Sequence, residues 1–283
     1  MNKDQERDHP RRVALGRPHL VGSWRDSATV TASIVKQPVA FRSDGLALLG
    51  YLFKPKGAGP FPGVLWNHGS ELAPGQSLQF DTAGKFFLEA GYALFAPVRR
   101  GHEGSEGEYV VDETDRMRET SGAEEANRLV VRKLETEQLD DQLAGLGYLR
   151  ALPFVDNERL VVVGGSYGGI QALLGASRRV GYRAAVALSP AALSWEGNPL
   201  LGARLLQAVR ETEIPVMLLQ PPKECLEPSR VLGAEFKRLG KQFVGKIYPA
   251  EGPEELQVHC FGGVKGMHIW LGDALAFLKE EIR

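Results

Sequence analysis

The sequence predicts an α/β fold in which helices cover both faces of a mostly parallel sheet. Short runs of apolar, β-branched or aromatic residues alternate along the chain with longer segments whose apolar residues recur at helical spacing. Several of the short runs are apolar throughout, as strands are when helices cover both faces of their sheet. This alternation is typical of strand–helix–strand units, which build parallel sheets.

Each expected strand is short and bounded by glycine, proline or polar residues. The expected strands are residues 46–53, 63–66, 93–97, 160–163, 184–188, 216–219 and 243–247. The expected helices lie between them, at about 76–90, 122–151, 167–179, 199–210, 228–240 and 271–282. No repeat and no long linker divides the chain. We therefore expect one folded domain over residues 36–283, preceded by a polar N-terminal extension over residues 1–35.

Composition excludes several classes of protein. The 283 residues carry a formal net charge of −1, with 43% apolar and 24% charged residues, as in ordinary globular proteins. A near-neutral charge gives no reason to expect nucleic acid or an anionic membrane as partner. No apolar run approaches the 18 residues of a membrane span, and the N-terminus lacks the apolar core of a secretory signal. Two cysteines, Cys225 and Cys260, fit a reducing compartment, so we expect a cytoplasmic protein.

The longest charged segment covers residues 112–142, where charges sit beside a stripe of leucine and valine. Two interpretations are open. The favoured one is a solvated helix on the outer face of the sheet, and the other is a cap over a functional site.

The stretch RLVVVGGSYGGIQALLGA, residues 159–176, contains the most informative motif. An apolar run leads into Gly-x-Ser-x-Gly, formed by Gly164, Ser166 and Gly168, and a helical pattern follows. This order is typical of a nucleophile elbow, which holds a serine in a strained conformation above the carboxyl edge of a sheet. Larger residues two positions before and after the serine would collide with strand or helix. Ser166 is therefore the candidate nucleophile. The alternatives are a purely structural glycine turn and a phosphate-binding loop, although no phosphate-loop motif is present.

A serine hydroxyl needs a base to take its proton, and elbow proteins place both the acid and the histidine after the serine. Only His259 and His268 follow Ser166. His259 opens a loop with glycines after it and can reach over the sheet edge. His268 sits two residues before Trp270, where we expect the last helix to begin, and can simply pack or cap there. We favour His259 as the base.

The acid should lie just beyond the expected strand 216–219. Glu224 lies in the irregular part of the following loop, whereas Glu227 precedes Pro228, a typical first helical residue. We favour Glu224, which would hold the imidazole tautomer and stabilise the imidazolium.

An oxyanion needs two N–H donors. The backbone of Tyr167, directly after the nucleophile, should supply one, and the loop after the strand in GVLWNHGS should supply the other. There we expect the backbone of Ser70, with Glu71 as the alternative. His68 is expected to be a structural hydrogen-bonding residue, not a catalyst.

The chain resembles the α/β-hydrolase superfamily, specifically the dienelactone-hydrolase-like group of serine esterases and their peptidase relatives. The resemblance covers residues 40–282 and rests on WNHGSE, FAPVRRGHEGSEGEY, VVVGGSYGGIQALLGA, SPAALSW, PVMLLQPPKECLEPSRVLGAEFKRLGK and VHCFGGVKGMHIWLGDALAFL. Similar sequences carry an Asn-Asp pair where this chain has Lys223-Glu224, and the name-giving lactone hydrolases use a cysteine where it has Ser166. The resemblance implies an eight-stranded, mostly parallel sheet, acyl transfer to water and no cofactor.

These observations together predict a serine esterase. No cationic clamp is evident, which favours small uncharged esters of short-chain carboxylic acids. Trp195 and Tyr109 are the candidate walls of the substrate pocket, although core packing is an equal alternative. The rival functions are a peptidase or amidase with the same three residues and a non-catalytic ligand-binding protein. Cys225 follows the acid and Cys260 follows the base, so the two thiols can lie near one another; we expect both to be free.

Overall fold

The computed structural model describes residues 29–31, 34–76, 78–252, 254 and 258–283. Within them, nine strands form one sheet in the order β1-β2-β3-β5-β4-β6-β7-β8-β9. The strands are β1 (Thr29–Thr31), β2 (Ile34–Ser43), β3 (Leu46–Phe53), β4 (Phe61–Asn67), β5 (Ala93–Pro97), β6 (Val155–Gly165), β7 (Tyr182–Leu188), β8 (Val216–Gln220) and β9 (Phe243–Ile247). The pairs among β1, β2, β3 and β5 are antiparallel, and all the others are parallel. The seven strands expected from the apolar runs correspond to β3–β9. Strand β2 brings the number to the eight that the resemblance implies, and β1 adds a short strand at one edge.

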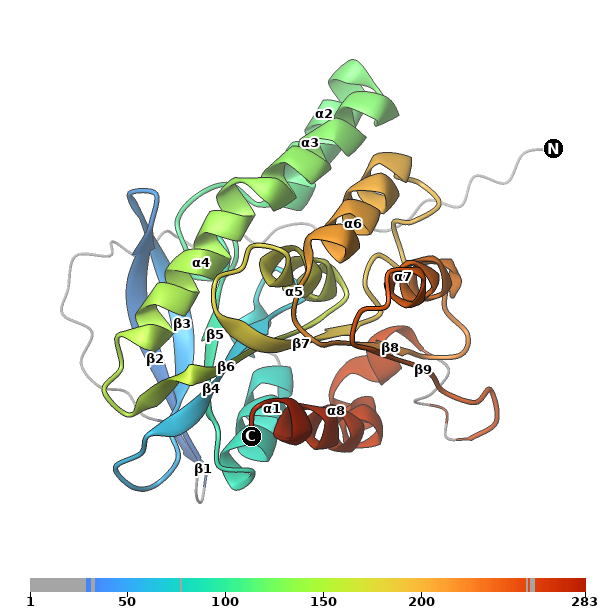
Figure 1. Ribbon diagram of the computed structural model, residues 1–283. Coiled ribbons are helices and arrows are strands. Elements are labelled where there is room, and N and C mark those ends of the chain that lie inside the picture. The colour runs from blue at the N-terminus through green and yellow to red at the C-terminus, as the bar shows by residue number, and fades with distance from the viewer. Residues whose placement is uncertain (1–28, 32–33, 77, 253, 255–257) are drawn as a thin grey trace.

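Helices cover both faces of the sheet, as the alternating pattern predicts (Figure 1). The helices are α1 (Leu78–Glu89), α2 (Val110–Ser121), α3 (Ala123–Glu135), α4 (Glu137–Arg150), α5 (Tyr167–Ala176), α6 (Pro199–Glu211), α7 (Glu227–Arg238) and α8 (Met267–Glu281), with short 3-10 helices η1 (Pro74–Gln76) and η3 (His259–Gly266). Helices α1 and α8 lie on one face, and α4, α5, α6 and α7 lie on the other. The fold class predicted from the sequence is therefore confirmed.

The central strands are apolar because both of their faces are covered. In β6, Leu160 and Val162 pack toward α4 and α5, while Val161 and Val163 pack toward α1 and α8, and all four are fully buried. Burying such side chains stabilises the fold by about 1.5–3 kcal/mol each. Because these strands run parallel, their carboxyl ends meet at one edge of the sheet, where β6 leads into α5.

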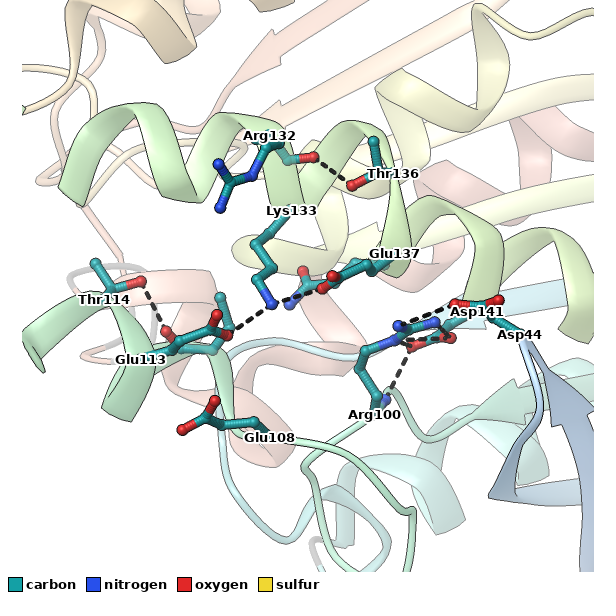
Figure 2. Close-up of polar contacts among 12 residues, drawn as sticks. Asp44, Arg100, Glu108, Glu113, Thr114, Arg132, Lys133, Thr136, Glu137 and Asp141 are labelled. Carbon is teal, nitrogen blue, oxygen red and sulfur yellow. Dashed lines mark hydrogen bonds and ion pairs between the residues drawn. The ribbon is translucent and has the colours of Figure 1, made fainter. Parts of the chain in front are cut away.

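Residues 112–142 form parts of three helices instead of one. Helices α2 and α3 make a hairpin that projects beyond the sheet, and α3 continues into α4 after a break at Thr136 (Figure 1). Lys133 of α3 links the three helices, because its ammonium lies 2.7 Å from Glu113 of α2 and 2.6 Å from Glu137 of α4 (Figure 2). Burial lowers the pKa of Lys133, but its contacts with Glu113 and Glu137 raise it more, so the net pKa is raised.

Most of the expected N-terminal extension, residues 1–28, lies outside the described residues. The described part of the range 1–35 contains β1 and the first residues of β2, so it contributes to the sheet. No helix in the described part of the chain has the length and hydropathy needed to cross a membrane.

The ion pair between Arg100 and Asp141 anchors the loop after β5 to α4 (Figure 2). The Arg100 Nη2 and Nε atoms lie 2.7 and 3.0 Å from the carboxylate, and the Arg100 N–H donates to it at 2.9 Å. Asp141 is fully buried. Removing one partner of such a pair leaves the other charge buried without compensation.

We therefore expect Asp141→Ala to lower the free energy of unfolding by about 3–5 kcal/mol, measured by urea denaturation. Asp115→Ala is the matched control, because Asp115 pairs with Arg118 at an exposed position. Asp115→Ala should lower the free energy of unfolding by less than about 1 kcal/mol. Equal losses in the two variants would contradict this account of the loop.

Candidate active site

Ser166 occupies a strained turn between β6 and α5. Its φ and ψ are 56° and −118°, a region that residues with side chains rarely adopt. The Ser166 N–H donates to the carbonyl of Leu188 at 2.8 Å. A Cβ atom at Gly164 would lie 2.1 Å from the Gly168 carbonyl oxygen, and one at Gly168 would lie 2.1 Å from the Asn67 carbonyl oxygen. The turn therefore has the geometry that the Gly-x-Ser-x-Gly motif predicts.

His259 reaches Ser166 from the start of η3. Its Nε2 atom lies 2.8 Å from the Ser166 hydroxyl, and its Nδ1 atom lies 3.1 Å from Oε1 of Glu224. A carboxylate only accepts hydrogen bonds, so Nδ1 carries the ring proton and Nε2 is left as an acceptor for the serine hydroxyl. Serine, imidazole and carboxylate thus form one continuous hydrogen-bonded chain.

The Glu224 carboxylate is held from several sides and its side chain is only 5% exposed. Besides His259, it accepts hydrogen bonds from the Cys260 N–H at 2.7 Å, the Ser189 hydroxyl at 3.2 Å and the Gln220 side-chain amide at 2.6 Å. These donors come from η3, the loop after β7 and the end of β8. The extra methylene of glutamate is accommodated in this setting without loss of the contact to the ring.

The surroundings of His259 favour its protonated form. Burial lowers the pKa of His259, but contacts with Cys260 and Glu224 raise it more, so the net pKa lies above the ordinary histidine value. The Cys260 sulfur lies 3.6 Å from Nε2 of His259, the same nitrogen that contacts the Ser166 hydroxyl. Glu224 thus stabilises the imidazolium that forms once the neutral ring has accepted a proton at Nε2.

The two residues expected to supply oxyanion donors, Tyr167 and Ser70, both lie near Ser166. Tyr167 is the first residue of α5, and N–H groups in the first turn of a helix have no acceptor within the helix. Ser70 lies in the loop after β4 and lines the same pocket as Ser166. The structure thus brings the two expected oxyanion donors and the three expected catalytic residues to one place.

The pocket beside Ser166 has a cavity volume of about 340 Å³. Its walls combine an apolar side with polar groups near the serine. The apolar lining comes from Trp66, Leu188, Leu193, Met267 and Trp270, and the polar lining includes Asn67, His68, Glu71, Gln79 and His259. In the described part of the chain, no lysine or arginine lines this pocket. The lining favours an uncharged ligand.

Two expected wall residues do not line this pocket. The Trp195 ring is partly buried and lies over Gly202 of α6, and the neighbouring Leu193, which is 77% exposed, lines the pocket instead. The Tyr109 hydroxyl donates to the Ser70 carbonyl at 2.5 Å, so this side chain supports the loop that carries an expected oxyanion donor. Residue type and loop position did not reveal where either ring points.

The residues that the sequence analysis did not favour as base and acid, His268 and Glu227, do not line the pocket beside Ser166. His268 is exposed near the start of α8, which begins at Met267, earlier than expected from Trp270. Glu227 is the exposed first residue of α7. His68 is buried and hydrogen-bonds the Arg99 N–H and the Gly69 carbonyl, which is the structural role expected of it.

Both cysteines are free. The Cys225 sulfur lies 4.0 Å from a carboxylate oxygen of Glu196, whereas Cys260 lies against His259. Among the residues that the structure describes, no group of three or more His, Cys, Asp or Glu side chains is arranged to hold a metal ion.

Arg99, which the sequence analysis did not include among the site residues, lies buried behind the loop of His68 and Gly69. A charged residue two positions after a fully apolar strand is the signal that points to such a buried group.

Comparison with known proteins supports this reading of the fold. A model of the prolyl oligopeptidase family matches residues 106–196 of the chain. No curated protein sequence matches the chain.

Several solved structures share the fold at low sequence identity. Est1E from Butyrivibrio proteoclasticus, solved with ferulic acid bound, has 20% identity and a TM-score of 0.65 over 86% of this chain and 99% of its own. The Pyrococcus furiosus esterase Pf2001 has 16% identity and a TM-score of 0.64 over 89% of this chain and 93% of its own. Acylaminoacyl peptidase from Pyrococcus horikoshii has 18% identity and a TM-score of 0.64 over 88% of this chain, which spans only 42% of the length of that peptidase. The chain therefore has the α/β-hydrolase fold.

Gly168→Ala should disrupt the turn that carries Ser166. The added methyl group would meet the backbone of Asn67 and His68, which cannot move away cheaply, so we expect a loss of about 1–3 kcal/mol in unfolding free energy. Gly147→Ala is the control, because Gly147 is exposed in α4 with open space around it. This substitution should raise the free energy of unfolding by up to about 1 kcal/mol. Urea denaturation measures both, and a Gly168→Ala protein as stable as wild type would contradict the steric argument.

The raised pKa of His259 predicts a pH-dependent contribution to stability. Because folded His259 holds its proton more tightly than the unfolded chain, this contribution is complete below about pH 6.5 and is lost as pH rises through the raised pKa. Glu224→Gln should lower the pKa of His259 and reduce the pH-dependent part of stability. NMR titration of the His259 ring and urea unfolding across pH measure the two effects. An unchanged His259 titration would show that Glu224 does not act on the ring.

Proposed function

We propose that the protein is a serine hydrolase that cleaves small, uncharged carboxylic esters, with Ser166 as nucleophile, His259 as general base and Glu224 as the acid that orients His259. The observation that carries the proposal is the hydrogen-bonded chain from the Ser166 hydroxyl through both nitrogens of His259 to Glu224. The strained turn at Ser166 supports the proposal, and the backbone N–H groups of Tyr167 and Ser70 are the proposed oxyanion donors.

In the first half of the reaction, the Ser166 oxygen attacks the ester carbonyl carbon and its proton passes to Nε2 of His259. The carbonyl oxygen becomes an oxyanion, which the N–H groups of Tyr167 and Ser70 would stabilise. Glu224 stabilises the imidazolium without taking its proton. The tetrahedral intermediate then collapses, the bond to the alcohol oxygen breaks, and that oxygen takes the proton from His259. The products are a free alcohol and an acyl group on Ser166.

In the second half, His259 accepts a proton from water, which attacks the acyl carbon. The new tetrahedral intermediate expels the Ser166 oxygen, and the serine recovers its proton from His259. A carboxylic acid leaves and the site is restored. Every proton transfer uses the same nitrogen, which is the one that lies 2.8 Å from Ser166.

The pocket supports a small substrate with an apolar part. About 340 Å³ holds an ester of modest size, and the tryptophan, leucine and methionine side chains bury its hydrocarbon groups. Glu71 at the same pocket disfavours a substrate anion. We therefore propose short-chain esters as substrates, and a small molecule as the only partner that the reaction needs.

Peptide or amide cleavage is the second candidate function, because the matching family model is that of the prolyl oligopeptidases and one structural relative is an acylaminoacyl peptidase. Within the fold, we keep the dienelactone-hydrolase-like esterase group as the proposed place of the chain, since its motifs extend over residues 40–282. A protein that only binds ligands would not need an intact chain of serine, histidine and carboxylate.

Purified protein should hydrolyse p-nitrophenyl acetate, and Ser166→Ala or His259→Ala should lower kcat by about 10⁴- to 10⁶-fold. Ser194→Ala is the matched control, because Ser194 lies on the loop after β7 and does not line the pocket. It should keep activity within about twofold. Wild-type protein without activity above that of Ser166→Ala would contradict the proposed function.

Matched p-nitrophenyl esters and p-nitroanilides of the same acyl groups separate the two candidate reactions. We expect kcat/KM for the acetyl ester to exceed that for the acetyl anilide, and to fall as the acyl chain grows beyond the size of the pocket. Equal or faster cleavage of the anilide would replace the esterase proposal with the amidase alternative.

A further inference from the structure

Arg99 is a buried cation that faces neutral partners. It is 2% exposed and lies two residues after the end of β5. Its guanidinium donates to the His68 carbonyl at 2.7 Å, to the Gly69 carbonyl, and to Oε1 of Gln171 at 2.8 Å. It also lies over the ring of Tyr167, 5.0 Å from the ring centre.

The neighbouring Arg100 shows what is unusual about Arg99. Arg100 forms a close ion pair with Asp141 and lies 3.9 Å from Asp44, so its charge is compensated (Figure 2). Within the described residues, Arg99 has no ion pair. Its guanidinium donates to carbonyl and amide oxygens and lies 3.0 Å from Nδ1 of His68. Burial lowers the pKa of Arg99 to about 10, which still leaves the guanidinium charged near neutral pH. A buried charge without a contacting counter-ion destabilises the fold, and such costs concentrate at functional sites.

The Gly69 carbonyl oxygen accepts a hydrogen bond from the Arg99 guanidinium. The His68 ring lies against the same groups. Its Nδ1 atom is 2.9 Å from the Gly69 oxygen and 3.0 Å from Arg99 Nη2, and its Nε2 atom is 3.2 Å from the Arg99 backbone nitrogen. The Gly69 oxygen and the Ser70 N–H belong to one planar trans peptide and point in opposite directions. Fixing the oxygen on the Arg99 side therefore turns the Ser70 N–H away from Arg99, and polarises it as a donor.

Arg99 also touches the second oxyanion donor. Tyr167 carries that N–H at the start of α5, and Gln171 lies one turn later on the same helix. One guanidinium thus contacts the loop of Ser70 and the helix of Tyr167 at the same time. The Tyr109 hydroxyl donates to the Ser70 carbonyl in the same loop.

We propose that Arg99 is a positioning residue for the oxyanion site: it fixes the Gly69–Ser70 peptide relative to α5 and places a buried positive charge behind the position where negative charge develops. The inference rests on the proposed function and deepens it. Arg99 does not touch the substrate, because it lies behind the loop and does not line the pocket. Its effect should appear in the transition state more than in substrate binding.

The test compares Arg99→Met with wild type in p-nitrophenyl acetate hydrolysis and in inhibition by phenylboronic acid, whose tetrahedral adduct with serine resembles the intermediate. We expect Arg99→Met to lower kcat about 10²-fold, the typical cost of a displacement of about 1 Å at a reacting centre, with KM within threefold. The inhibition constant of phenylboronic acid should rise by a comparable factor. Arg99→Lys keeps the positive charge but not the planar set of guanidinium donors, and should lower kcat about tenfold.

Arg204→Met controls for the loss of a largely buried arginine, because Arg204 pairs with Glu135 and Glu211 away from the pocket. It should lower the melting temperature but keep kcat within twofold. If Arg99→Met does not fold, Arg99→Lys and Tyr109→Phe decide the question, and each should lose kcat without a matching rise in KM. Unchanged kcat and boronate inhibition in the folded Arg99 variants would overturn the inference while leaving Ser166-dependent activity intact. Wild-type protein without Ser166-dependent turnover would overturn the proposed function, and this inference with it.

Discussion

Four hydrogen bonds converge on the Glu224 carboxylate, and the geometry of the whole site depends on them. They come from His259, from the backbone of Cys260, and from the side chains of Ser189 and Gln220. Cys260 has a φ of 49°, an unfavourable value for a residue with a side chain, and its N–H is held by the same carboxylate oxygen that holds the His259 ring. One carboxylate thus fixes both the ring and the strained backbone that carries it.

The sheet makes this convergence possible. Ser166 follows β6, Glu224 follows β8 and His259 follows β9, and these strands are parallel, so the loops after them emerge at one edge. Behind that edge, the sequence supplies two kinds of constraint. Gly164 and Gly168 let β4, β6 and α5 approach without side chains between them, and the buried Arg99 ties the loop after β4 to α5. The pocket beside Ser166 therefore lies next to elements that close packing and hydrogen bonds hold together.

The sequence predicted the parts of the fold whose signals are local. The bounds of β3, β5 and β9 follow from their apolar runs, and the turn at Ser166 follows from its glycines. Strand β2 was not expected, because charged and polar residues interrupt its apolar pattern. Helix α2 was missed because few of its residues are buried, and the break at Thr136 has no glycine or proline to mark it. Directions of side chains such as Trp195 depend on tertiary packing and were not accessible from spacing alone.

The central claim is that Ser166 acts as a nucleophile activated by His259. The most direct measurement is covalent labelling with a fluorophosphonate, followed by mass spectrometry of the digested protein. The account predicts a single adduct on the peptide that contains Ser166. In a His259→Ala protein, it predicts that the same adduct forms more slowly. An unlabelled wild-type protein, or an adduct on a residue other than Ser166, would contradict it.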